Sequence, residues 1–230
     1  MNISLKNPII LALDVDDQKT AFDHLKKLGH LIGAVKLGPR LVYRYGSEFV
    51  KVCANTCPVF VDNKYFDIPS TMVAAVQASF DSGATLVTVH ALSGSEALKQ
   101  LTDLEKKLNQ IRPFKILAVT ILTSWDEKSF PPSFNTWPVQ DHVVGLANLV
   151  VDSGLSGIVC SGHELNLLKD KNIYKVVPGI RLSSDTDSNH DQKRVMSPKE
   201  ALTSGAQALV IGRALLQSKN PEKDIQDILN

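Results

Sequence analysis

A regular alternation of apolar runs and helical segments constrains the fold of this chain more than any other feature of its sequence. Each run is short, rich in branched apolar residues and followed by a segment whose apolar residues have helical spacing. Strands are predicted at residues 9–14, 32–37, 58–61, 85–90, 114–120, 156–160, 174–177 and 207–211. Helices are predicted at residues 16–28, 39–53, 69–81, 94–108, 138–152, 163–169 and 198–204, and from residue 212 onward with a break near Pro221.

Eight such units predict an α/β protein with an all-parallel sheet and helices outside it. A closed (β/α)8 TIM barrel accommodates eight units and leaves no sheet edge, so we expect one barrel domain over residues 1–230. The alternative is an open doubly wound sheet. That fold usually carries a Gly-rich first turn, whereas the first turn here is Asp14-Val15-Asp16-Asp17.

Composition narrows the partners and the compartment. A formal net charge of +1 gives no reason to expect nucleic acid or a membrane surface as a partner. The apolar run 8–13 is too short to span a bilayer, and no signal-peptide pattern accompanies it. The three cysteines form neither a disulfide framework nor a zinc motif. We therefore expect a cytoplasmic protein, and we find no ligand set that predicts a metal or another cofactor.

Charged side chains gather where the predicted strands end, which is where barrels carry out their chemistry. Asp62 and Lys64 share a face on an extended chain, and Lys36 ends the neighbouring strand about 4.8 Å away. With Asp67 they form a set of alternating sign, in which each lysine stays protonated. Such a lysine suits a proton donor or an electrostatic clamp. The alternative is a surface ion pair with Asp67 capping the next helix.

Two later segments predict an anion site. Arg181 follows Pro178-Gly179-Ile180 at the end of the seventh strand, and Gly212-Arg213 opens a helix after the eighth. Arginines and backbone N–H groups at a helix start bind phosphate, and barrels commonly bind it after these two strands. The alternative for Arg213 is a position on the helix surface.

Two further strand ends are polar. Asp14 could accept hydrogen bonds from a sugar hydroxyl, or it could cap the following helix. For His90 we favour a supporting hydrogen-bonded position at the top of the barrel over a catalytic one.

Two long connections, 122–137 and 182–197, follow strand ends and should lie over the same mouth of the barrel as lids or binding loops. The polar second loop could instead be a disordered insertion.

The chain resembles the orotidine 5′-phosphate decarboxylase family almost from end to end. The motif Asp62-x-Lys64-x-x-Asp67-Ile68-Pro69-x-Thr71 is shared with a wider group of phosphosugar enzymes, but the combination of motifs is specific. The other matching motifs are Ala12-Leu13-Asp14, Val35-Lys36-Leu37-Gly38, Thr88-Val89-His90-Ala91, Val119-Thr120-x-Leu122-Thr123-Ser124, Pro178-Gly179-Ile180-Arg181, Asp191-Gln192-Lys193-Arg194-Val195 and Ile211-Gly212-Arg213.

This resemblance implies cofactor-independent decarboxylation of orotidine 5′-phosphate to UMP, in a homodimer with active sites at the subunit interface. It implies that Lys64 protonates C6 of the pyrimidine. It also implies that Asp62 and Lys36 hold the array of charges around Lys64 and contact the substrate. Substrate contacts are implied for the ribose (Asp14 and Lys36), the base (Thr123), the phosphate (Arg181, Gln192, Gly212 and Arg213) and, from the partner subunit, for Asp67, Ile68 and Thr71.

Two rival functions remain open on the sequence. A magnesium-dependent decarboxylase or synthase of phosphosugars shares the Asp-x-Lys-x-x-Asp motif, but those enzymes carry an acidic residue where this chain has Lys36. A catalytically inactive barrel could bind nucleotides or a protein partner. The intact set of charges argues against that second rival.

Overall fold

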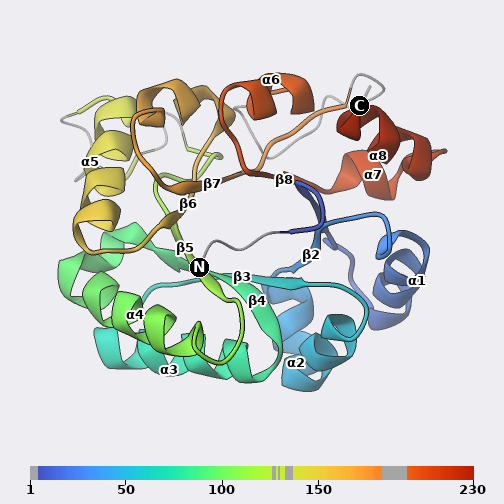
Figure 1. Ribbon diagram of the computed structural model, residues 1–230, viewed down its shortest axis with the longest axis horizontal. Helices are drawn as coiled ribbons and strands as arrows, with labels where there is room; N and C mark the ends of the chain where they lie inside the picture. Colours follow the sequence, from blue (N-terminus) through green and yellow to red (C-terminus); the bar gives the residue numbers. More distant parts are fainter. Residues whose placement is uncertain (1–4, 126–127, 129, 133–136, 183–195) are drawn as a thin grey trace.

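Eight parallel strands pair in sequence order and close on themselves in the computed structural model, which describes residues 5–125, 128, 130–132, 137–182 and 196–230 (Figure 1). The predicted TIM barrel is therefore confirmed, and the first strand pairs with the eighth to close it. The strands are β1 (Ile9–Ala12), β2 (Ala34–Leu37), β3 (Val59–Tyr65), β4 (Ala84–His90), β5 (Lys115–Val119), β6 (Gly157–Val159), β7 (Tyr174–Val177) and β8 (Ala208–Ile211).

Helices surround the strands, as Figure 1 shows. Local chemistry explains several of their starts: Asp17 accepts from the Thr20 N–H at the first helix, and Pro39 and Pro69 occupy the first turns of the second and third helices. The helical elements are α1 (Gln18–Leu28), α2 (Pro39–Ala54), α3 (Pro69–Asp81), η1 (Ala91–Ser93), α4 (Gly94–Leu108), α5 (Val139–Asp152), η3 (Gly162–Leu168), α6 (Pro198–Thr203), α7 (Arg213–Leu216) and α8 (Pro221–Leu229).

Two apolar cores follow from the alternation of side chains along each strand. The larger core lies between the strands and the helices, and it includes residues such as Leu11, Val87 and Leu98. A smaller core fills the barrel interior with Ile10, Ala12, Ala34, Phe60, Leu86, Leu117, Val176, Ala208 and Val210. This inner core makes the barrel a solid support, so polar side chains collect above it at the C-terminal strand ends.

Several element boundaries differ from the sequence prediction. The third strand continues to Tyr65 instead of ending near Asp62, while the first ends at Ala12. The predicted helix at 163–169 is a 3-10 helix over Gly162–Leu168, and α2 is kinked at Gly46, where φ is 69°. The break expected near Pro221 is confirmed, because α7 and α8 are separate helices.

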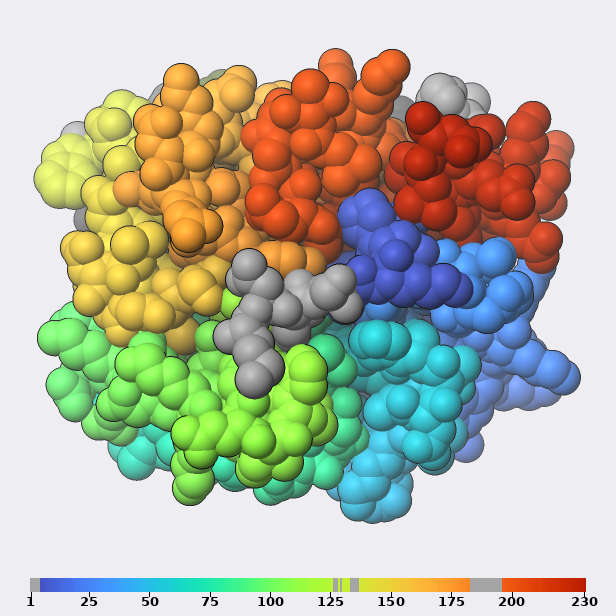
Figure 2. Space-filling view, in the orientation of Figure 1, coloured from blue at the N-terminus to red at the C-terminus, as the bar shows by residue number. Residues whose placement is uncertain are grey.

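The first and last strands of the chain meet where the barrel closes. The N–H of Leu209 donates to the carbonyl of Pro8, and in Figure 2 the blue N-terminal segment lies against orange and red C-terminal segments. Among the described residues, no helix is long and apolar enough to cross a membrane. Of the two predicted lid loops, 182–197 lies almost entirely outside the described residues, and 122–137 lies partly outside them.

Candidate active site

The end of β3 departs from regular strand geometry, and this departure carries the central lysine. Val61 pairs with Val87 and Tyr65 pairs with Val89, so three residues of β3 lie opposite a single residue of β4. Within this bulge Lys64 has φ of 49°, the only positive φ of a non-glycine residue in the described part of the chain. A left-handed residue costs about 1–2 kcal/mol. Strain of this kind is typical of functional sites.

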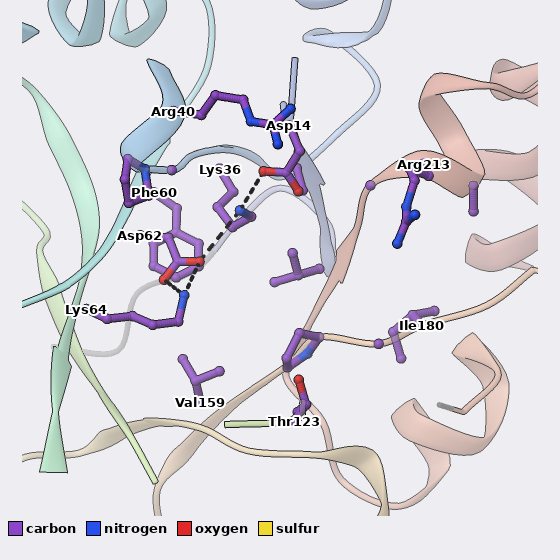
Figure 3. Close-up of a pocket in the computed structure, with 18 of the residues that line it drawn as sticks. Asp14, Lys36, Arg40, Phe60, Asp62, Lys64, Thr123, Val159, Ile180 and Arg213 are labelled. Carbon is purple, nitrogen blue, oxygen red and sulfur yellow. Dashed lines mark hydrogen bonds and ion pairs between the residues drawn. The ribbon is translucent and has the colours of Figure 1, made fainter. Parts of the chain in front are cut away.

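Four side chains from two strands and the loop after β1 form a line of alternating charge (Figure 3). The Lys64 ammonium donates to both oxygens of Asp62, at 2.9 and 3.0 Å. Lys36 lies 3.6 Å from Asp62 Oδ2 and donates to Asp14 Oδ1 at 3.2 Å. The predicted contact between Lys36 and Asp62 is therefore present, and the line runs Asp14, Lys36, Asp62, Lys64.

Asp67 does not join this line, and Asp14 holds the fourth position instead. The Asp67 side chain is exposed and accepts a hydrogen bond from the N–H of Ile68 at 2.6 Å. Ile68 and Thr71 are exposed as well, and none of the three lines the cavity beside Lys64. The sequence prediction joined Asp67 to the set because its spacing from Lys64 is short, but the chain turns away after Tyr65.

The line of charges forms one wall of a cavity of about 610 Å³. Thr123, Arg181, Gly212 and Arg213 line it as well, and Figure 3 shows Arg213 across the cavity from Lys64. The buried Nε of Arg181 has no hydrogen-bond partner among the described residues. Gln192 lies outside the described residues.

Two glycines, Gly179 and Gly212, lie on the arginine side of the cavity. A Cβ atom added to Gly212 would lie 3.4 Å from Cβ of Ala12 and 3.7 Å from Asp14 Oδ2. Gly179 has φ of 78°, which an L side chain rarely adopts. The cavity thus places two arginines at one end and the Lys36–Asp62–Lys64 group at the other, which suits an anion with a second polar group several ångströms away.

Comparison with known proteins agrees with this geometry. Residues 7–228 match the sequence profile of the orotidine 5′-phosphate decarboxylase / HUMPS family. The chain belongs to this family. It is 37% identical over 227 residues to the orotidine 5′-phosphate decarboxylase of Erythrobacter litoralis, covering 97% of this chain and 98% of that protein.

Two other relatives support the same grouping. The orotidine 5′-phosphate decarboxylase of Pseudoalteromonas translucida is 37% identical, over 96% of this chain and 94% of its own. The crystal structure of orotidine 5′-phosphate decarboxylase from Lactobacillus acidophilus superposes with a TM-score of 0.83 at 30% identity, covering 97% of this chain and 98% of that one. Membership in the decarboxylase family therefore extends over the whole barrel.

Two polar residues of this decarboxylase-family site were missed by the sequence analysis. Arg40, in the first turn of α2, lines the cavity and forms an ion pair with Asp16 at 3.1 Å. Thr88 on β4 contacts both Asp62 and the backbone of Lys64. Thr88 was part of a matching motif but received no role. Its position two residues before His90, on the same strand face, was the available signal.

The protonation of the site follows from its contacts. Burial alone would raise the pKa of Asp62, but the charges of Lys36 and Lys64, with hydrogen bonds from Lys64 and Thr88, lower it below its ordinary value. Asp62 is therefore a carboxylate at neutral pH.

Burial and the nearby charge of Lys64 lower the pKa of His90 to about 4. A neutral His90, whose Nδ1 accepts from the N–H of Leu92 at 3.4 Å, fits the supporting position favoured from the sequence.

We expect His90 to make the fold less stable in mild acid. Between its unfolded pKa near 6.5 and its folded pKa of about 4, the unfolded chain binds a proton that the folded chain does not, so stability falls as pH falls. His90→Asn should therefore lose about 2 kcal/mol less stability than the wild type between about pH 7 and pH 5. Urea unfolding at both pH values measures this, with exposed His30→Asn as the control; equal losses in His90→Asn and wild type would contradict it.

Proposed function

We propose that this chain decarboxylates orotidine 5′-phosphate to UMP without a cofactor, in the last step of UMP synthesis. One observation carries the proposal: a single cavity has an Asp14–Lys36–Asp62–Lys64 line on one wall and two arginines across from it. The full-length relatives named orotidine 5′-phosphate decarboxylase support it.

The chemistry of the cavity orients the substrate. Its phosphate dianion matches the Arg181 and Arg213 side, where the N–H groups that follow Gly212 can also donate. The ribose then lies near Asp14 and Lys36, and the base extends between Thr123 and Lys64. Phosphate binding at a distance from the reacting carbon supplies energy for aligning the base.

The reaction needs a cation at the carbon that loses carbon dioxide. When the C6–carboxylate bond breaks, its electron pair stays at C6, where no carbonyl can delocalise it. The Lys64 ammonium stabilises this charge and transfers its proton to C6, and the resulting amine regains a proton from solvent. Asp62 holds the ammonium in place with bonds of 2.9 and 3.0 Å. Lys36 lies on the other side of Asp62 and keeps that carboxylate charged.

We further propose that the chain acts as a homodimer whose subunits complete each other's sites. Asp67 lies between two largely exposed apolar side chains, Phe66 (62% exposed) and Ile68 (64%). Such a loop suits burial against a second subunit. Asp67, Ile68 and Thr71 would then contact the substrate bound to the partner. Gln192, which lies outside the described residues, would contact the phosphate.

The magnesium-dependent rival fits this cavity less well. The ammonium of Lys36 lies between Asp14 and Asp62, the place between two carboxylates that a metal cation would otherwise take. Within the described residues, no group of three or more His, Cys, Asp or Glu side chains could hold a metal ion. We also propose a cytoplasmic location, because three buried cysteines without a disulfide framework suit a reducing compartment.

Loss of orotidine 5′-phosphate absorbance is the direct test of this function. We expect micromolar protein to convert the nucleotide to UMP, and to do so equally well after EDTA treatment. Activity that EDTA abolishes and magnesium restores would favour the phosphosugar rival instead. No conversion at micromolar protein would refute the proposed function and favour a non-catalytic barrel.

A further inference from the structure

We propose that Thr88 is a positioning residue that fixes Lys64 and Asp62 relative to each other. It is the one residue of β4 that lies between the Val61–Val87 and Tyr65–Val89 pairs, directly opposite the β3 bulge. Its side chain is fully buried and does not line the cavity, so it acts through its neighbours and not on the substrate. This inference rests on the proposed decarboxylation.

The direction of each hydrogen bond to the Thr88 hydroxyl is determined by its partner. The N–H of Lys64 can only donate, and it lies 2.9 Å from Thr88 Oγ1. The Asp62 carboxylate can only accept, and its Oδ1 also lies 2.9 Å from Thr88 Oγ1. The hydroxyl therefore accepts from the backbone of one residue and donates to the side chain of the other.

The two Thr88 hydrogen bonds satisfy the Lys64 N–H in the bulge and restrain the Asp62 carboxylate. The N–H of Lys64 lies in an irregular stretch of the β3–β4 ladder, and without Thr88 it would lack this partner in a buried setting. Asp62 Oδ1 receives the Lys64 ammonium and the Thr88 hydroxyl together, so the carboxylate cannot rotate without losing both bonds. The start and the end of the Lys64 side chain are thus held by one hydroxyl and its carboxylate partner.

Preorganised charge is what stabilises a developing carbanion, and a small displacement of the ammonium weakens it steeply. Thr88 should therefore affect the reacting state more than the binding of product. UMP lacks charge at C6, whereas 6-hydroxyuridine 5′-monophosphate carries an ionised oxygen there when deprotonated. The ratio of the two affinities measures how well Lys64 is aimed, without requiring turnover.

Thr88→Val, which keeps the shape and removes the hydroxyl, is the direct test. We expect kcat to fall about 10- to 100-fold while KM and UMP affinity change less than about threefold. Affinity for 6-hydroxyuridine 5′-monophosphate should fall about as much as kcat. Thr88→Ser should restore both quantities to within about threefold of the wild type. If Thr88→Val does not fold, Thr88→Cys supplies the comparison, because a thiol bonds weakly.

Thr102→Val is the matched control. Thr102 is also buried, but its hydroxyl donates to the carbonyls of Leu98 and Ser153, away from the cavity. That variant should lower the melting temperature and leave kcat unchanged. An unchanged kcat in Thr88→Val, or an equal loss in Thr88→Ser, would overturn the inference. Equal losses of UMP and analogue affinity would also overturn it. A wild-type chain that leaves orotidine 5′-phosphate unchanged would instead refute the proposed function, and the affinity ratio would still test Thr88.

Discussion

Lys64→Ala should lower kcat for orotidine 5′-phosphate by about 10⁴-fold or more, because it removes both the proton donor and the cation at C6. Binding should suffer far less. The arginines across the cavity remain, and Asp62 keeps the ammonium of Lys36 at 3.6 Å, so no buried carboxylate is left unpaired. UMP affinity should therefore fall no more than about tenfold. Single-turnover kinetics and calorimetric UMP titration measure the two effects separately.

Lys115→Met is the control for losing a buried lysine. Lys115 is 2% exposed at the start of β5, the opposite end of the barrel from the cavity, where its ammonium donates to Ser156 Oγ at 2.8 Å. Its loss should lower stability without lowering kcat. Turnover by Lys64→Ala at the wild-type rate would refute the role of Lys64 as proton donor.

Asp67→Ala should also be nearly inactive, and mixing it with Lys64→Ala should restore activity. If each site takes Lys64 from one subunit and Asp67 from the other, half of randomly mixed dimers carry one intact site out of two. The mixture should then reach about a quarter of wild-type activity per subunit. Activity measured after subunit exchange, with exchange followed by mass spectrometry, tests this expectation.

A second mixture separates a shared site from nonspecific recovery. Asp62 and Lys64 are 2.9 Å apart within one chain, so both serve the same site. Mixing Asp62→Ala with Lys64→Ala therefore assembles no intact site and should recover nothing. Recovery in both mixtures, or in neither once exchange is complete, would refute a site that depends on Asp67 of the partner.

The barrel could be predicted from sequence because its pattern is local and repeated. Each strand is a short apolar run and each helix has its own spacing and capping residues, so the order of elements needs no knowledge of distant contacts. The ends of individual strands and helices are harder to predict than their order. The extension of β3 to Tyr65 depends on pairing with β4, which the polar residues after Val61 do not reveal.

Most of the candidate site could also be predicted, since strand ends in a parallel barrel meet at one rim. Lys36, Asp62 and Lys64 are brought together as expected, and the two arginines lie across the same cavity. Gln192 lies outside the described residues, and the roles of Asp67 and Thr71 depend on a second subunit. Those assignments stay predictions.

The sequence by itself determined the eightfold alternation, the family and the set of charged strand ends, because these depend on residue order and local spacing. Only the tertiary structure decided which charges touch. It replaced Asp67 with Asp14 in the line, since the Asp14 carboxylate accepts a hydrogen bond from the Lys36 ammonium across two strand ends. It also revealed the left-handed Lys64 and the buried Thr88 opposite it, because a bulge and its partner arise from the register between two strands and not from either strand alone.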